Sequence, residues 1–113
     1  MNKKMMDCCT SCCECRTTCL QTMQMCLKKG GKLADAKLCL MLAECAQLCQ
    51  VTADMAATGS ESCAKVAESC AKHCEDCARA CDAMNEESLK QCASVLRECA
   101  AICKGMKSAA VAA

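Results

Sequence analysis

Apolar positions recur along this chain at intervals of three and four residues, which is the spacing of one face of an α-helix. The pattern is interrupted at residues 29–32, which contain two glycines, at residues 58–60, which contain another, and at residues 85–87. The segments between these breaks are each about 20 to 25 residues long, a length typical of bundle helices. The pattern therefore predicts four helices.

Residues near the breaks support these boundaries. Two lysines precede Gly30, as is common at a helix C-terminus. Ser60 and Asn85 are each followed by acidic residues, which is typical of an N-cap. We therefore predict that the third helix begins after Ser60 and the fourth after Asn85.

The apolar face of each predicted helix is made largely of cysteine. At about 100° per residue, the cysteines of the first segment form a stripe roughly 60° wide. They are Cys8, Cys12, Cys15, Cys19 and Cys26. The third segment has Cys63, Cys70, Cys74, Cys77 and Cys81, and the fourth has Cys92, Cys99 and Cys103 with Leu96 and Met106 alongside. In the second segment, thiols share the face with aliphatic residues: Leu38, Cys39, Leu42, Cys45, Ala46, Cys49 and Ala53.

Short connections between consecutive helices favour antiparallel neighbours. We predict an all-α protein, an antiparallel up-down-up-down four-helix bundle with a cysteine-lined core, that forms a single domain over residues 1–113. The spacing Cys-x3-Cys-x2-Cys-x3-Cys occurs in both the first and the third helix, from Cys8 to Cys19 and from Cys70 to Cys81. These two helices are expected to have equivalent roles.

Composition and charge exclude several classes of function. Of 113 residues 18 are cysteine, and the absence of Phe, Trp and Tyr leaves no aromatic side chain to stack on nucleic-acid bases. The formal net charge of +1 lacks the basic excess that drives binding to phosphate backbones. No stretch approaches the roughly 20 apolar residues that span a bilayer, and the opening MNKKMMDCC has neither an apolar signal region nor a twin-Arg pair. We expect a cytoplasmic protein without nucleic-acid or membrane partners.

Two ordinary uses of cysteine fit the stripes poorly. A secreted disulfide scaffold is rich in loops, whereas this chain is dominated by helix formers, and side chains one helical turn apart have Cβ atoms about 5–6 Å apart where a disulfide needs about 3.8 Å. A buried cysteine can act as a small hydrophobic residue. A core of Cys and Ala, however, forgoes about 1.5–3 kcal/mol for each large side chain that it lacks. The stripes therefore predict metal binding.

The arrangement of the thiols favours Cu(I) among the soft metals. Thiolates select Cu(I), Zn(II) or iron–sulfur clusters. A structural zinc site needs four ligands in a closed tetrahedron, and long stripes of unequal thiol number do not divide naturally into such sites. The two thiolates of a Cys-x3-Cys pair can hold a two-coordinate Cu(I) ion, and bridging thiolates allow multiple ions per chain.

The methionines add a weaker indication of the same chemistry. Most of the nine are expected to fill gaps in a core without aromatic side chains. In an antiparallel bundle, one end would gather Met1, Met5, Met6, Met55 and Met106. Thioethers at that end could pass Cu(I) inward without holding it tightly.

Three further residues are given no ligand role. His73 lies about 80° from the thiol stripe of the third helix, a position more typical of a surface residue than of a ligand. Cys9 and Cys13 lie on a second face of the first helix and could contact a neighbouring helix, a partner subunit or a peripheral metal.

A nucleophilic cysteine needs a base and an orienting group, and one histidine among 18 thiols provides no defined pair. We therefore predict that the protein is not an enzyme.

With its two repeats and Cys92, Cys99 and Cys103, nearly the whole chain resembles the bacterial copper storage proteins. The resemblance implies a four-helix bundle whose core cysteines bind many Cu(I) ions, association into tetramers, and a cytosolic location for members without a Tat signal. It transfers a ligand role directly to Cys8, Cys12, Cys15, Cys19, Cys70, Cys74, Cys77 and Cys81. It transfers that role more loosely to Cys26, Cys39, Cys45, Cys49, Cys63, Cys92, Cys99 and Cys103.

Two features depart from that family pattern. Its members commonly place histidine near the open end of the bundle, whereas His73 lies away from both ends. The doublets Cys8-Cys9 and Cys12-Cys13 are denser than the repeat requires and could supply several sulfurs to a polynuclear cluster. An iron–sulfur protein, acting in electron transfer or cluster storage, is therefore the main alternative, and a zinc or cadmium buffer of the metallothionein type is a third.

Overall fold

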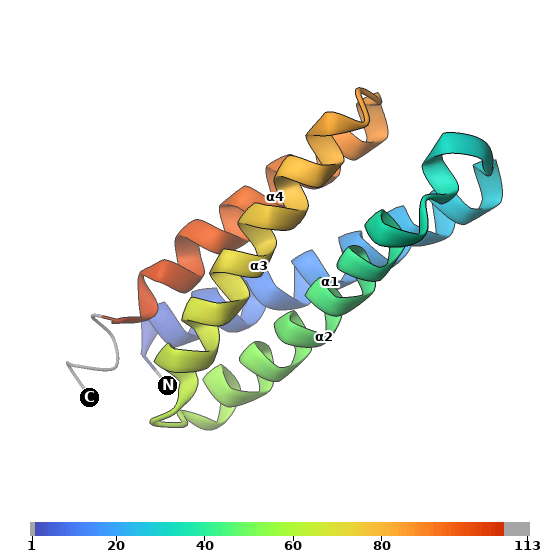
Figure 1. Ribbon diagram of the computed structural model, residues 1–113. Coiled ribbons are helices and arrows are strands. Elements are labelled where there is room, and N and C mark those ends of the chain that lie inside the picture. The colour runs from blue at the N-terminus through green and yellow to red at the C-terminus, as the bar shows by residue number, and fades with distance from the viewer. Residues whose placement is uncertain (1, 108–113) are drawn as a thin grey trace.

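A computed structural model describes residues 2–107, which form four α-helices (Figure 1). They are α1 (Lys3–Lys29), α2 (Ala36–Thr58), α3 (Cys63–Ala83) and α4 (Glu87–Lys104), with a short 3-10 helix, η1 (Gly31–Ala34), before α2. Residues 2–107 contain no β-strand, which confirms the predicted all-α class. None of the described helices combines the length and the apolar character needed to cross a membrane.

The helices form an elongated antiparallel bundle that measures 48 × 19 × 18 Å along its principal axes. α1 packs mainly against α2, and α3 packs mainly against α4, so the bundle consists of two helical hairpins. Figure 1 shows the start of α1, the α2–α3 turn and the end of α4 at one end of the molecule, opposite the two hairpin turns. The predicted up-down-up-down arrangement is confirmed.

Glycines and capping side chains define both ends of α1 and both ends of α2. Gly30 and Gly59 end α1 and α2 with positive φ angles of 71° and 68°, a region that glycine enters without steric cost. At the start of α1, the Asn2 side chain accepts the backbone N–H of Met5 at 2.9 Å. At the start of α2, the Asp35 carboxylate accepts the backbone N–H of Leu38 at 2.9 Å.

The predicted N-caps of α3 and α4 are wrong by one or two residues. The Ser60 hydroxyl accepts the backbone N–H of Ser62 at 3.2 Å, so it closes a turn before the helix, and Ser62 occupies the N-cap position. Asn85 has a φ angle of 53°, a left-handed conformation that asparagine tolerates better than most residues. The chain then turns into α4 at Glu86, whose carboxylate accepts the backbone N–H of Leu89 at 3.2 Å.

The core is made mainly of cysteine and alanine. Leu42, Leu89, Leu96 and Met106 are among its few large side chains, and each is fully buried. Every member of the predicted face of α2 is buried, as are Leu96 and Met106 on the fourth helix. The inward faces that the periodicity predicted are therefore the faces that pack in the bundle.

Candidate metal centre

Every cysteine of the predicted ligand set lies in the interior of the bundle. None of them exposes more than 9% of its surface, and all 18 cysteines of the chain are free thiols. The helices direct these side chains inward because the cysteines recur at three- and four-residue intervals. The interior is therefore a column of thiols that runs along the bundle.

Thiols from different helices approach one another closely. The Sγ atoms of Cys45 and Cys74 are 3.4 Å apart, and those of Cys49 and Cys70 are 3.7 Å apart. Cys12 Sγ lies 3.6 Å from Cys103 Sγ and 3.8 Å from Cys99 Sγ. These separations are far longer than a disulfide bond of about 2.05 Å and suit sulfurs that share a soft metal ion.

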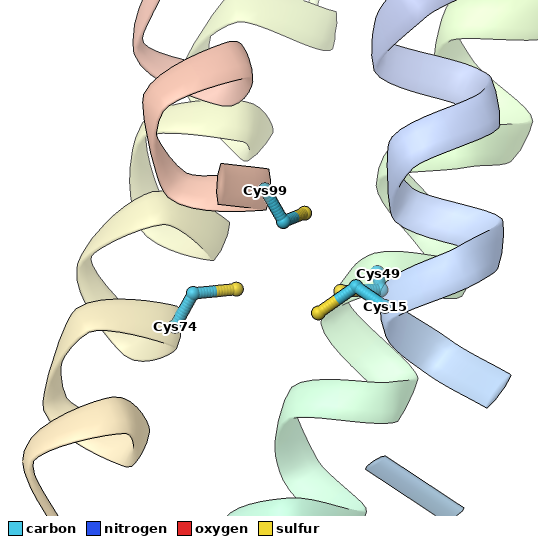
Figure 2. Close-up of side chains that lie close together, drawn as sticks. All are labelled: Cys15, Cys49, Cys74 and Cys99. Carbon is cyan, nitrogen blue, oxygen red and sulfur yellow. The ribbon is translucent and has the colours of Figure 1, made fainter. Parts of the chain in front are cut away.

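Four sets of buried sulfurs are compact enough to hold a metal ion, because all sulfurs within each set lie within 4.8 Å of one another. The largest set is Cys15, Cys49, Cys74 and Cys99, which takes one thiol from each helix (Figure 2). The sets of three are Cys8–Cys12–Cys103, Cys12–Cys49–Cys70 and Cys15–Cys19–Cys45. Because Cys12, Cys15 and Cys49 each belong to two sets, the sets form a continuous chain of sulfurs.

The remaining predicted ligands are buried but belong to none of these sets. They are Cys26, Cys39, Cys63, Cys77, Cys81 and Cys92. Most of them lie towards the hairpin-turn end of the bundle. The compact sets therefore extend from the end where α1 begins and α4 finishes to the middle of the bundle.

Crowding of the thiols gives them divergent acidities. Hydrogen bonds from Cys103 and Cys12 lower the pKa of Cys8 to about 4, and hydrogen bonds from Cys19 and Cys81 lower the pKa of Cys92 to about 4. In contrast, burial raises the pKa of Cys63 to about 11. The thiolate is the form that binds a metal. Thiols with a lowered pKa are therefore already deprotonated at neutral pH, whereas thiols with a raised pKa must release a proton when they bind.

The two sequence repeats show the same order of pKa shifts. Hydrogen bonds from neighbouring thiols lower the pKa of the first cysteine of each repeat, Cys8 and Cys70. The pKa of each later cysteine is raised: Cys12, Cys15 and Cys19 in one repeat, and Cys74, Cys77 and Cys81 in the other.

The residues without a predicted ligand role lie outside the thiol column. Cys9 is half-buried and Cys13 is exposed on the outer side of α1. The Nε2–H of His73 donates to the backbone carbonyl of Met41 at 3.3 Å, and Nε2 lies 3.8 Å from a carboxylate oxygen of Glu44. His73 therefore links α3 to α2 on the outside of the bundle, as its angle from the stripe predicted.

The methionines fall at the end predicted for them, with different degrees of exposure. Met5 and Met106 are buried, Met55 is half-buried, and Met6 is 52% exposed. Met1 lies outside the described residues. The structure thus places thioethers both inside and at the surface of the end from which the compact sulfur sets extend.

A groove between α3 and α4, with a volume of about 580 Å³, also approaches the thiols and was not anticipated from the sequence. Cys103 contributes to its floor, and ion pairs join its two sides, Lys104 to Glu75 at 2.5 Å and Lys107 to Glu68 at 3.9 Å. Sequence periodicity assigns such charged residues only to the solvent face and gives no signal that they pair across a groove.

Comparison with known proteins identifies a protein family and a similar solved structure. The family model of the copper storage proteins matches residues 1–108. A crystal structure of a protein from Nitrosospira multiformis superposes with a TM-score of 0.88 at 29% sequence identity, covering 96% of this chain and 98% of that one. No curated protein matches the chain.

Proposed function

Because this chain belongs to the copper storage protein family, we propose that it sequesters multiple Cu(I) ions on the thiolates that line its core, in the cytoplasm and without catalysing a reaction. The observation that carries the proposal is the continuous chain of buried sulfurs formed by the four compact sets. Cu(I) accepts two or three thiolates and tolerates bridging, so sets that share members suit it well.

The proposed ligands are the buried cysteines. The members of the compact sets would bind first, because their sulfurs need the least movement to reach a common ion. The remaining ligands, Cys26, Cys39, Cys63, Cys77, Cys81 and Cys92, would complete the load as neighbouring sites fill. Binding releases protons from the thiols whose pKa is raised, so the affinity should increase with pH.

The proposal includes self-association, with a tetramer as the expected state from the family resemblance. Support comes from apolar side chains on the outside of the α1–α2 hairpin, where Leu27 is 55% exposed and Leu40 is 63% exposed. Both side chains are available for contact with another subunit.

An anaerobic titration of the reduced, metal-free protein with Cu(I) in the presence of a chromophoric competitor tests the proposal. We expect on the order of ten or more Cu(I) ions to bind per chain before the competitor is loaded, since each thiolate can bridge. Circular dichroism before and after loading should show a helical protein in both states, because buried leucine and alanine side chains pack the helices together.

The same preparation separates copper storage from the iron–sulfur alternative. Cu(I) has a filled d shell and gives no visible colour, whereas iron–sulfur clusters absorb broadly in the visible range. Saturation at only a few equivalents of Cu(I), or a brown protein on isolation, would contradict storage and favour clusters.

A further inference from the structure

We propose that Cys15, Cys49, Cys74 and Cys99 form a site for a single divalent cation of the zinc class, with tetrahedral coordination that differs from that of Cu(I). The inference rests on the proposed function only in that both use the thiols of the core. It departs from the expectation that the stripes would not divide into closed four-thiolate sites.

The geometry of the four sulfurs fits one ion. A Zn–S bond of about 2.3 Å places the sulfurs of a regular tetrahedron about 3.8 Å apart. The four Sγ atoms lie within 4.8 Å of one another, so a contraction of at most about 1 Å completes the site. Figure 2 shows the side chains of Cys74 and Cys99 pointing from one hairpin towards Cys15 and Cys49 on the other.

The positions of the four ligands on the helices, and their burial, also fit a closed site. Each helix contributes one thiol, and all four side chains are fully buried. A four-coordinate ion would therefore have no open position for water, as in structural zinc sites. A cubane iron–sulfur cluster would need a cavity of its own size among the thiolates, and these sulfurs are too close together to surround one.

Neighbouring thiols can stabilise the charge of the filled site. Four thiolates around a divalent ion leave a net charge of −2, which is costly to bury without hydrogen bonds. Cys74 Sγ lies 3.4 Å from Cys45 Sγ, and Cys49 Sγ lies 3.7 Å from Cys70 Sγ.

Cys99 Sγ has two such neighbours, Cys12 Sγ at 3.8 Å and Cys103 Sγ at 4.0 Å. In each of these contacts either sulfur can be the hydrogen-bond donor, so the neighbours can share charge with the ligands. Partners of this kind around the ligands hold them in place and tune the affinity of a metal site.

Cobalt(II) titration under anaerobic, reducing conditions tests the proposal, because Co²⁺ replaces zinc in tetrahedral thiolate sites and reports its geometry through its visible spectrum. We expect one equivalent of Co²⁺ per chain to bind tightly, with intense ligand-field bands of tetrahedral Co²⁺ and thiolate-to-cobalt charge transfer in the near ultraviolet. One equivalent of Zn²⁺ should then remove the visible bands.

Cys74→Ser and Cys99→Ser each remove one ligand with little change in shape. Loss of an outer partner alone costs a metal site about 10–100-fold in affinity, so loss of a ligand should weaken Co²⁺ binding by at least that factor. The matched control is Cys77→Ser on the same helix as Cys74, because Cys77 is equally buried but belongs to no compact set. The control should keep both the affinity and the spectrum of the unchanged protein.

Octahedral spectra, several equivalents of equal affinity, or equal losses in Cys74→Ser and Cys77→Ser would each overturn the proposal. Circular dichroism of each variant shows whether a loss comes from unfolding, and Cys99→Ser provides a second ligand variant if Cys74→Ser does not fold. Cu(I) titration of the unchanged protein separates the two proposals. A normal Cu(I) load without the cobalt spectrum contradicts only the divalent site, and the cobalt spectrum with a low Cu(I) load contradicts only storage.

Discussion

Cysteine performs two tasks at once in this core, packing and chemistry. As a packing residue it is small, and it replaces side chains whose burial would each contribute about 1.5–3 kcal/mol. As a chemical group it exchanges hydrogen bonds with its neighbours, and those from Cys19 and Cys81 lower the pKa of Cys92. A hydrogen bond with Cys77 lowers the pKa of Cys81, but a hydrogen bond with Cys92 and burial outweigh it and raise that pKa to about 12. Burial could be predicted from the spacing of these residues, whereas their acidities depend on neighbours contributed by other helices.

The pKa of Cys63 predicts how stability depends on pH. Burial raises it to about 11 from an ordinary value of 9.0, so the folded state holds the proton more tightly than the unfolded state does. This contribution to the free energy of unfolding is fully present below pH 9 and is lost as the pH rises to 11. It should amount to roughly 2–3 kcal/mol.

Urea denaturation of the reduced, metal-free protein, followed by circular dichroism, measures this effect. The difference in the free energy of unfolding between the unchanged protein and Cys63→Ala should shrink between pH 9 and pH 11. Lysine deprotonation affects both proteins alike, so a difference that stays constant over this range would show that Cys63 does not titrate as described.

At the level of the helices, the sequence indicates where each element lies but not how each one begins. The glycines at 30 and 59 interrupt the pattern and take positive φ angles that end α1 and α2, so these boundaries were predictable. The N-caps of α3 and α4 were not, because Ser60 and Asn85 have side chains that suit either a cap or the turn before it. Only the path of the chain between the helices selects one of the two uses.

Asp35 provides a test of capping in α2. Replacing it with alanine removes the acceptor for the Leu38 N–H and should lower the free energy of unfolding by about 1 kcal/mol. Ser62→Ala is the matched control, because Ser62 occupies the N-cap of α3 without a side-chain cap bond and should change stability by less than about 0.5 kcal/mol. Chemical denaturation measures both, and equal effects would contradict the assigned caps.

At the scale of the whole molecule, the offset of the helices along the bundle axis determines which cysteines meet. Aligning the two repeats would pair Cys8 with Cys70, but the structure groups Cys70 with Cys12 and Cys74 with Cys15. The repeat in α3 is therefore shifted by one cysteine relative to that in α1. Periodicity within a helix specifies which face turns inward, but only the loops and the packing between hairpins set this shift, so the composition of the sulfur sets could not be predicted.

The proposed uptake end can also be tested at this scale. Replacing Met5, Met6 and Met106 with leucine preserves apolar volume but removes the thioethers, so Cu(I) uptake should slow several-fold while the final capacity changes little. Stopped-flow mixing with a Cu(I)–chromophore complex measures the rate. Met25→Leu combined with Met84→Leu, towards the opposite end, is the control, and unchanged kinetics in the triple variant would contradict this route.

The column of thiols has a consequence for the order in which stored ions leave the protein. The bundle is 48 Å long and under 20 Å wide in its other directions, and its compact sulfur sets share members along the axis. If ions enter and leave through the methionine end, the ions bound towards the hairpin-turn end lie deepest, behind the filled compact sets. Those ions would then be the last to leave the protein, and the ions held nearest the methionine end would be the first.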